Sequence, residues 1–160
     1  MAELDVKELA AYIQKKYCQE KQKEISPIRL QKSLYFLFAY WGGIVRKSKM
    51  YPNAVEEDYS KFSEYLFDEE IEAWVYGPVI PVVYREKNIS KYYNETMFYG
   101  KDKVKDFIDD LLKDLFEVGD FTLVDISHSD NSWKNSFSYE DEFHDNIINK
   151  EDIIEEYARK

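Results

Sequence analysis

The chain has 160 residues, of which 44% are apolar and 17% aromatic, which suffices for one folded domain and argues against a disordered chain. Residues 1–50 carry 10 Lys/Arg and 5 Asp/Glu, whereas residues 51–160 carry 12 Lys/Arg and 27 Asp/Glu. The larger part of the chain is therefore acidic, which disfavours unaided binding to nucleic acid and favours a basic protein partner. The single cysteine, Cys18, excludes an intramolecular disulfide, and no apolar run approaches membrane-spanning length, so we expect a cytoplasmic protein with no membrane partner.

A first helix is predicted close to the N-terminus. Asp5 can cap it, because a carboxylate accepts hydrogen bonds from the N–H groups that a first helical turn leaves without partners. Apolar residues from Val6 to Tyr17 then recur at helical spacing. The polar stretch 19–24 is expected to be a frayed helix end or a loop.

A second predicted helix is the most apolar part of the chain. Ser26 followed by Pro27 is a start signal, with a hydroxyl cap before a proline at the first helical position. Apolar residues from Leu30 to Trp41 cover nearly the whole circumference, so we expect this helix to be central to the core. Gly42-Gly43 is expected to stop it.

The middle of the chain has weaker signals. Residues 56–65 are expected to form a short charged helix, and residues 71–76 alternate crudely enough to predict a short strand or extended segment. Gly77-Pro78 bounds that segment, because the residue before a proline is disfavoured in a helix. Pro78 and Pro81 are then expected near the start of a helix that runs to about Lys87.

Helices are again predicted in the last third. Residues 104–116 have the clearest helical spacing, with Gly119 as a stop signal. Residues 121–126 are expected to be helical because Asp120 can cap them, and Asn149 can cap a terminal helix.

These elements predict a mainly α fold, a single-domain helical bundle with a small β element near residues 70–76. No internal repeat and no low-complexity linker divides the chain, so residues 1–160 are expected to form one domain. It ends in an acidic extension from about residue 137, whose run 140–142 is expected to be a solvated loop or a contact for a basic partner.

Three segments carry recognisable motifs. The first is Leu-Gln-Lys-Ser-Leu-Tyr-Phe at 30–36, followed by Ala39 to Trp41. The second is 67–84, which contains Ile-Glu-Ala-Trp-Val-Tyr-Gly-Pro-Val, and the third is Ile-Ser-His-Ser-Asp-Asn-Ser-Trp at 126–133. Together they resemble the SocA-like antitoxin family, also called the Panacea domain, and the resemblance spans roughly residues 8–135.

The resemblance implies an α-rich antitoxin domain, often encoded by a phage or prophage, that neutralises a toxin by direct contact. The implied partners are a cognate toxin, encoded by a neighbouring gene, and a Clp-type protease, because at least one family member is thought to act as a protease adaptor. Two departures stand out. Residues 46–65 resemble an insertion, and Ser127 and Ser132 stand where Thr and Pro are common.

The turn around Gly77 and Pro78 is the first candidate binding surface. Glycine reaches conformations that are closed to other residues, and Trp74, Tyr76 and Tyr84 place three large rings around it. Two interpretations stay open: the rings support the turn from the core, or one or more of them face the toxin.

His128 and Trp133 belong to the third motif. We expect His128 to be hydrogen-bonded inside the fold with its ring packed against an aromatic side chain. Metal binding through Asp125, His128 and Asp130, or through His144-Asp145, has only a weak signal, and we expect no metal and no cofactor. The candidate partner-binding residues are Trp74, Tyr76, Gly77, Pro78, Tyr84, His128 and Trp133.

No enzymatic template is present, since the sequence has no Gly-rich phosphate loop, no nucleophile elbow and no His-Glu-x-x-His zinc helix. We therefore expect a non-enzymatic antitoxin that binds its toxin. The alternatives are a phage-encoded inhibitor of a host defence or replication protein, whose acidic body mimics nucleic acid, and an enzyme that uses His128. A DNA-binding autoregulator is disfavoured, because no separate helix-turn-helix domain precedes residue 8.

Overall fold

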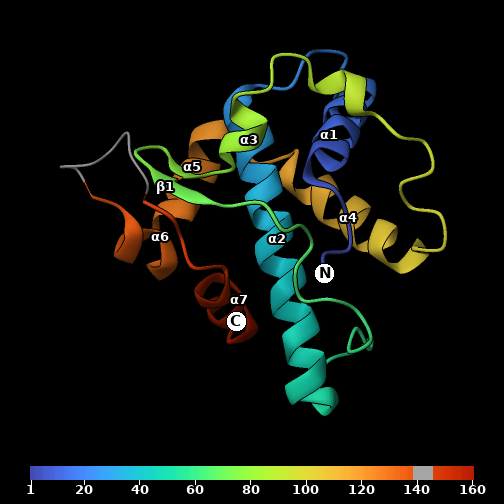
Figure 1. Cartoon of the computed structure of the whole chain (residues 1–160), viewed down its shortest axis with the longest axis vertical. Coiled ribbons are helices and arrows are strands. Elements are labelled where there is room, and N and C mark those ends of the chain that lie inside the picture. The colour runs from blue at the N-terminus through green and yellow to red at the C-terminus, as the bar shows by residue number, and fades with distance from the viewer. Residues whose placement is uncertain (139–145) are drawn as a thin grey trace.

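The computed structural model describes residues 1–138 and 146–160, so the predicted features at 140–142 and at His144-Asp145 lie outside the described residues. The described chain is mainly helical with one small antiparallel hairpin, as predicted (Figure 1). In chain order the elements are α1 (Val6–Lys21), α2 (Pro27–Met50), the 3₁₀ helix η1 (Pro52–Ala54), β1 (Glu72–Trp74), β2 (Gly77–Val79), α3 (Pro81–Tyr84), the 3₁₀ helix η2 (Ile89–Tyr92), α4 (Asp102–Leu115), α5 (Asp120–His128), α6 (Asn131–Ser136) and α7 (Lys150–Ala158).

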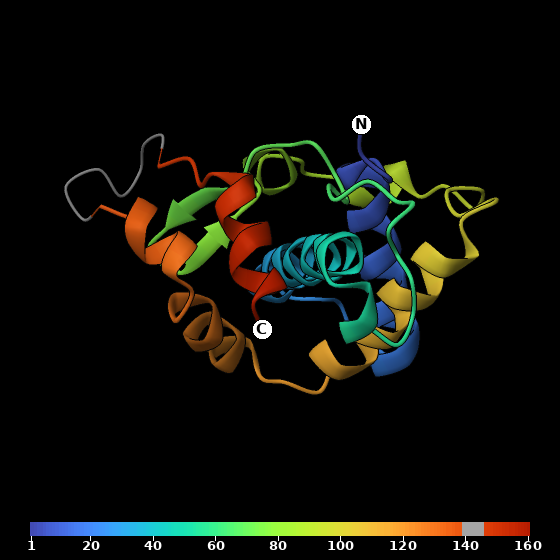
Figure 2. The same cartoon turned by 90° about the horizontal axis from the view of Figure 1, so that it is seen from below.

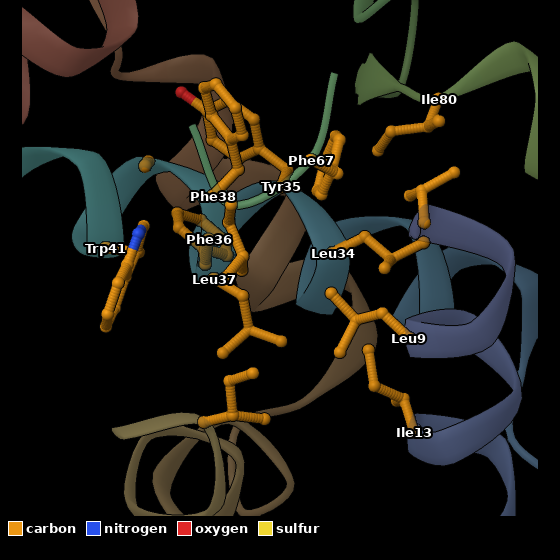
Figure 3. Close-up of a cluster of buried hydrophobic side chains, with 14 of the residues drawn as sticks. Leu9, Ile13, Leu34, Tyr35, Phe36, Leu37, Phe38, Trp41, Phe67 and Ile80 are labelled. Carbon is orange, nitrogen blue, oxygen red and sulfur yellow. The ribbon is translucent and has the colours of Figure 1, made fainter. Parts of the chain in front are cut away.

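Helix α2 is the centre of the molecule, as its apolar circumference predicts. Viewed nearly along its axis, it has α1 and α4 on one side and the hairpin, α5 and α6 on the other (Figure 2). Leu9 and Ile13 of α1 point toward Leu34 of α2 in the core (Figure 3). No helix in the described part of the chain is both long enough and apolar enough to cross a bilayer.

The prediction that Gly42-Gly43 stops this helix is wrong, because α2 continues to Met50. A Cβ atom on Gly42 would lie 2.5 Å from the Cγ1 of Ile154, and one on Gly43 would lie 2.8 Å from the carbonyl carbon of Tyr157. The two glycines thus let α7 pack against the α2 backbone, and this packing offsets their intrinsic cost within a helix of roughly 1 kcal/mol each.

The short helix predicted at 56–65 is also absent, and this segment is irregular. Besides a few local turn bonds, it is held by contacts with α2. The backbone N–H of Tyr59 donates to the Oγ of Ser48 at 3.1 Å, and the indole of Trp41 donates to the carbonyl of Ser63 at 2.9 Å. The apolar residues of this segment are too few to make a helical stripe, so no buried face favours a helix here.

Smaller differences concern helix ends. The polar stretch after Tyr17 stays helical to Lys21, and Gln22 ends α1 in the left-handed conformation. Gly119 is the residue before α5 rather than the end of α4, and Asp120 lies in the first turn of α5 without capping it. Helix α3 ends at Tyr84, short of Lys87. Helix ends depend on single capping contacts, so they are the least predictable bounds.

Candidate partner-binding site

The β1–β2 hairpin presents the candidate site, and Gly77 determines its shape. The two strands pair in antiparallel register, with Trp74 opposite Gly77, and Val75 and Tyr76 form the turn between them. Gly77 has φ +108°, a conformation that residues with a Cβ rarely adopt. A Cβ there would also lie 2.5 Å from the Oγ of Ser127 and 2.9 Å from the Cε of Lys32, so glycine is needed twice over.

Helix α2 supports the hairpin through two polar residues of the first motif, Gln31 and Lys32. Gln31 brackets the backbone of Ile80, since its Oε1 accepts from the N–H at 2.7 Å and its Nε2 donates to the carbonyl at 3.3 Å. The Nζ of Lys32 donates to the carbonyl of Pro78 at 3.0 Å. Pro78 lies in β2 rather than at the start of a helix, and Pro81 alone begins α3, which corrects the prediction for this pair.

The third motif supports the turn from the other side. The Nε2 of His128 lies 2.9 Å from the carbonyl oxygen of Val75, and the indole Nε1 of Trp133 donates to the carbonyl of Trp74 at 2.8 Å. The His128 and Trp133 rings stack with their centroids 4.2 Å apart, and Phe137 extends the stack. The expectation of a hydrogen-bonded His128 packed on an aromatic ring is confirmed, and the three motifs meet at one hairpin.

The side chains of the weak metal-site prediction, Asp125, His128 and Asp130, do not converge on one point. His128 faces the hairpin, whereas Asp130 is buried toward α2 and α7. One Asp130 oxygen accepts hydrogen bonds from the hydroxyls of Tyr35 and Tyr157, the latter at 2.5 Å, and the Nζ of Lys160 lies 3.3 Å from the other oxygen. Within residues 1–138 and 146–160, no three His, Cys, Asp or Glu side chains are grouped so that they could hold a metal ion.

The carboxylate of Asp130 also affects the pKa values of the two tyrosines that donate to it. Burial is the main cause that raises the pKa of Tyr35 and of Tyr157 well above the ordinary value, and the negative charge of Asp130 adds to it. Both hydroxyls are therefore protonated at neutral pH and donate to Asp130.

Exposure separates the predicted binding residues into two groups. Gly77, Pro78 and Trp133 are buried, and Trp74 and His128 are half-buried, so these residues build the site from inside. Tyr76 and Tyr84 are 58% and 60% exposed and are available to a partner. The edge of Tyr84 meets the ring of Trp74, with centroids 4.9 Å apart and planes at 73°.

A pocket of about 150 Å³ opens beside these rings. It lies between the N-terminal end of α2 and the hairpin, and most of its wall is apolar. The residues that line it are Pro27, Ile28, Gln31, Lys32, Trp74, Val75, Tyr76, Val79 and Tyr84.

Sequence reasoning missed Lys32 as a member of this site. Burial lowers the pKa of its amine to about 7. The available signal was a lysine within a helix expected to be apolar nearly all round, a position where a cation is rarely placed without a reason.

The family model "Antitoxin SocA-like, Panacea domain" matches residues 54–134, which is half of the chain. The match includes the second and third motifs, whereas the first motif lies before it, and it begins within the segment 46–65 that resembles an insertion. No curated protein and no solved structure gives a significant match to this chain. With its hairpin motif and its His128–Trp133 motif inside the matched region, the chain belongs to the SocA-like antitoxin family, the Panacea domain family.

Proposed function

We propose that this protein acts in the cytoplasm by binding a cognate toxin directly, and that Tyr76 and Tyr84 form part of the contact surface. Family membership supports an antitoxin-type role and a toxin partner in general. One observation carries the proposal to this surface: two exposed tyrosines, Tyr76 in the hairpin turn and Tyr84 at the end of α3, line the same apolar pocket.

The physical reason is preorganisation. Tyrosine offers a large contact area and a hydroxyl at a small entropic cost, and interface hot spots favour such rings beside desolvated pockets. Here side-chain hydrogen bonds to the carbonyls of Trp74, Val75 and Pro78 hold the hairpin before any partner arrives. A rigid surface loses less conformational entropy on binding, so more of the contact energy is available as affinity.

Charge supports a basic toxin. Residues 51–160 carry 27 Asp/Glu against 12 Lys/Arg, and a field of this sign attracts a positively charged protein. Steering of this kind raises the association rate more than the affinity, and salt screens it. Binding to the toxin is therefore expected to slow in high salt, chiefly through the association rate.

The test is co-expression with the product of the adjacent gene. We expect that product to be toxic alone, to be harmless with this protein, and to co-purify with it at a fixed stoichiometry. The double variant Tyr76→Ala/Tyr84→Ala is expected to lose the complex while its circular dichroism stays that of the folded protein, with a slightly lower melting temperature because Tyr84 no longer packs on Trp74.

The matched control is Tyr99→Ala, an exposed tyrosine in the segment before α4. That segment lies on the other side of α2 from the hairpin (Figure 1). If the toxin binds the double variant as tightly as it binds the wild type, Tyr76 and Tyr84 are not part of the contact surface. A neighbour that is harmless alone, or never co-purifies, would contradict direct neutralisation of that neighbour.

Delivery of the bound toxin to a Clp-type protease is a separate step that the same reagents test. If this protein is an adaptor, purified protease with ATP degrades the toxin faster when this protein is present, and the double variant loses the effect. Equal degradation rates with and without it would assign it to sequestration alone.

The proposal contains no catalytic step. His128→Gln keeps a hydrogen-bond donor toward Val75 but has no imidazole, so a folded variant is expected to neutralise the toxin as the wild type does. Loss of neutralisation with retained toxin binding would favour the His128-dependent enzyme instead.

A further inference from the structure

The amine of Lys32 is buried with less than its full set of partners. The side chain is 1% exposed, and its Nζ makes one hydrogen bond, to the carbonyl of Pro78 at 3.0 Å. A protonated lysine has three N–H donors and no acceptor. Among the residues that the structure describes, no carboxylate forms an ion pair with it, and burial alone shifts its pKa.

Arg29, one turn earlier on α2, shows what a satisfied buried cation looks like in this fold. It is 7% exposed, and its guanidinium lies 2.9 Å from a carboxylate oxygen of Asp120 and donates to the carbonyl of Leu115 at 2.9 Å. The chain thus supplies a carboxylate for the buried cation of Arg29. Lys32 has only a neutral carbonyl as a partner among the described residues, and it lies at the wall of a pocket.

That pocket is the right size for one side chain. Its volume is about 150 Å³, whereas pockets for drug-sized ligands hold roughly 300 Å³ or more. An apolar cavity of about 150 Å³ accommodates a benzene ring. Trp74, Tyr76 and Tyr84 supply aromatic walls, and Lys32 is among the residues that line the pocket. Among the described residues of that lining, its flexible stem carries the only cation.

We propose that this pocket binds an aromatic side chain of the partner protein together with an adjacent Asp or Glu carboxylate, which pairs with Lys32. The inference rests on the proposed function in one respect, that the partner is a protein. The aromatic ring replaces water against the apolar walls, and the carboxylate supplies the counter-charge that the fold does not. A basic toxin meets both conditions, because one acidic anchor residue is compatible with a positive net charge.

The experiment is an NMR titration of the ¹⁵N-labelled full chain with short blocked peptides. The probes are acetyl-Gly-Glu-Phe-Gly-amide and acetyl-Gly-Phe-Glu-Gly-amide, each with a Gln-for-Glu and an Ala-for-Phe version. At least one Glu–Phe peptide is expected to shift the Trp74 indole and Gly77 amide signals in a saturable way. Gln for Glu should weaken binding at least about tenfold, because a charge-assisted contact is lost.

Lys32→Met is the matched protein variant, since it keeps the length of the side chain and removes the charge. In this variant, if folded by circular dichroism, the Glu and Gln peptides should bind equally. If the variant does not fold, the Glu-to-Gln comparison on the wild type decides alone. Equal binding of the Glu and Gln peptides by the wild type, or no saturable shift with either Glu–Phe peptide, would overturn the proposal.

The peptide titration needs no toxin, so the two proposals fail separately. A toxin that co-purifies with the wild type, beside a negative titration, would leave toxin binding standing and remove the pocket. A positive titration without a toxin complex would leave the pocket standing and remove the assumed partner.

Discussion

The indole nitrogen of Trp133 donates a hydrogen bond of 2.8 Å to the backbone carbonyl of Trp74 and so joins two motifs that lie 59 residues apart in the chain. Trp133 is buried and its ring stacks on His128 and on Phe137, so the bond is held in a partly buried position. The exposed turn of the hairpin is therefore held by a buried side chain. A substitution at Trp133 is expected to affect this turn although Trp133 is not itself on the surface.

Trp133→Phe is expected to destabilise the protein by about 2 kcal/mol, because the carbonyl of Trp74 loses its donor and part of the ring area is lost. Chemical unfolding followed by circular dichroism measures this. Phe121→Ala, at an exposed aromatic on α5, should cost less than about 0.5 kcal/mol. A Trp133→Phe cost as small as that control would show that the bond contributes nothing.

Gly43→Ala is expected to destabilise by roughly 1–3 kcal/mol, because its Cβ would lie 2.8 Å from the backbone of Tyr157 and push α7 away. The measurement is the shift in urea midpoint. Gly119→Ala is the control, since its Cβ would meet only the Oγ1 of Thr122 at 3.8 Å. A stabilised Gly43→Ala protein, as expected for an ordinary helix interior, would contradict the close packing of α2 and α7.

Lys32 predicts how stability depends on pH. Burial lowers its pKa from 10.5 to about 7, so between these values the unfolded chain binds one more proton than the folded protein. The free energy of unfolding should therefore rise with pH from about 7 to 9.5, with a slope of at most about 1.4 kcal/mol per pH unit. Below pH 7 both states are protonated, and the folded protein bears the full cost of the buried charge.

Lys32→Met should remove that slope. The tyrosines with a raised pKa, such as Tyr12, make the free energy of unfolding depend on pH only near pH 10 and above, so they do not contribute between pH 7 and 9.5. Urea unfolding at half-unit pH steps measures both proteins. A wild-type stability that is flat or falls from pH 7 to 9.5 would show that the amine is not buried as described.

Asp130→Ala should destabilise by about 2–5 kcal/mol, because it leaves the buried hydroxyls of Tyr35 and Tyr157 without their acceptor. Thermal unfolding detects this as a lower melting temperature. Asp125→Ala, an exposed carboxylate in the preceding turn, is the control and should change little. Equal melting temperatures for the two variants would mean that Asp130 is not the acceptor of the buried pair.

Local signals in the sequence determined much of the helical framework. Three of the four predicted caps are present: the side chains of Asp5, Ser26 and Asn149 accept hydrogen bonds from backbone N–H groups of their own first turns, whereas Asp120 does not cap α5. Helix α4 and the short strand β1 also follow from patterns within a few residues. These features were predictable because capping and periodicity depend on neighbours in the chain.

What only the tertiary structure decided involves partners that are far apart in the sequence. In the sequence Gly42-Gly43 indicates the end of a helix, and only the packing of α7 against it explains why the helix continues. Likewise, only the packing of α5 and α6 behind the hairpin shows that Tyr76 is exposed and Trp133 is buried. In the sequence Lys32 stands out only as a lysine within an apolar helix; burial under the hairpin makes it an uncompensated cation beside a pocket. Composition and spacing cannot report this, because desolvation depends on which distant segments exclude water from a side chain.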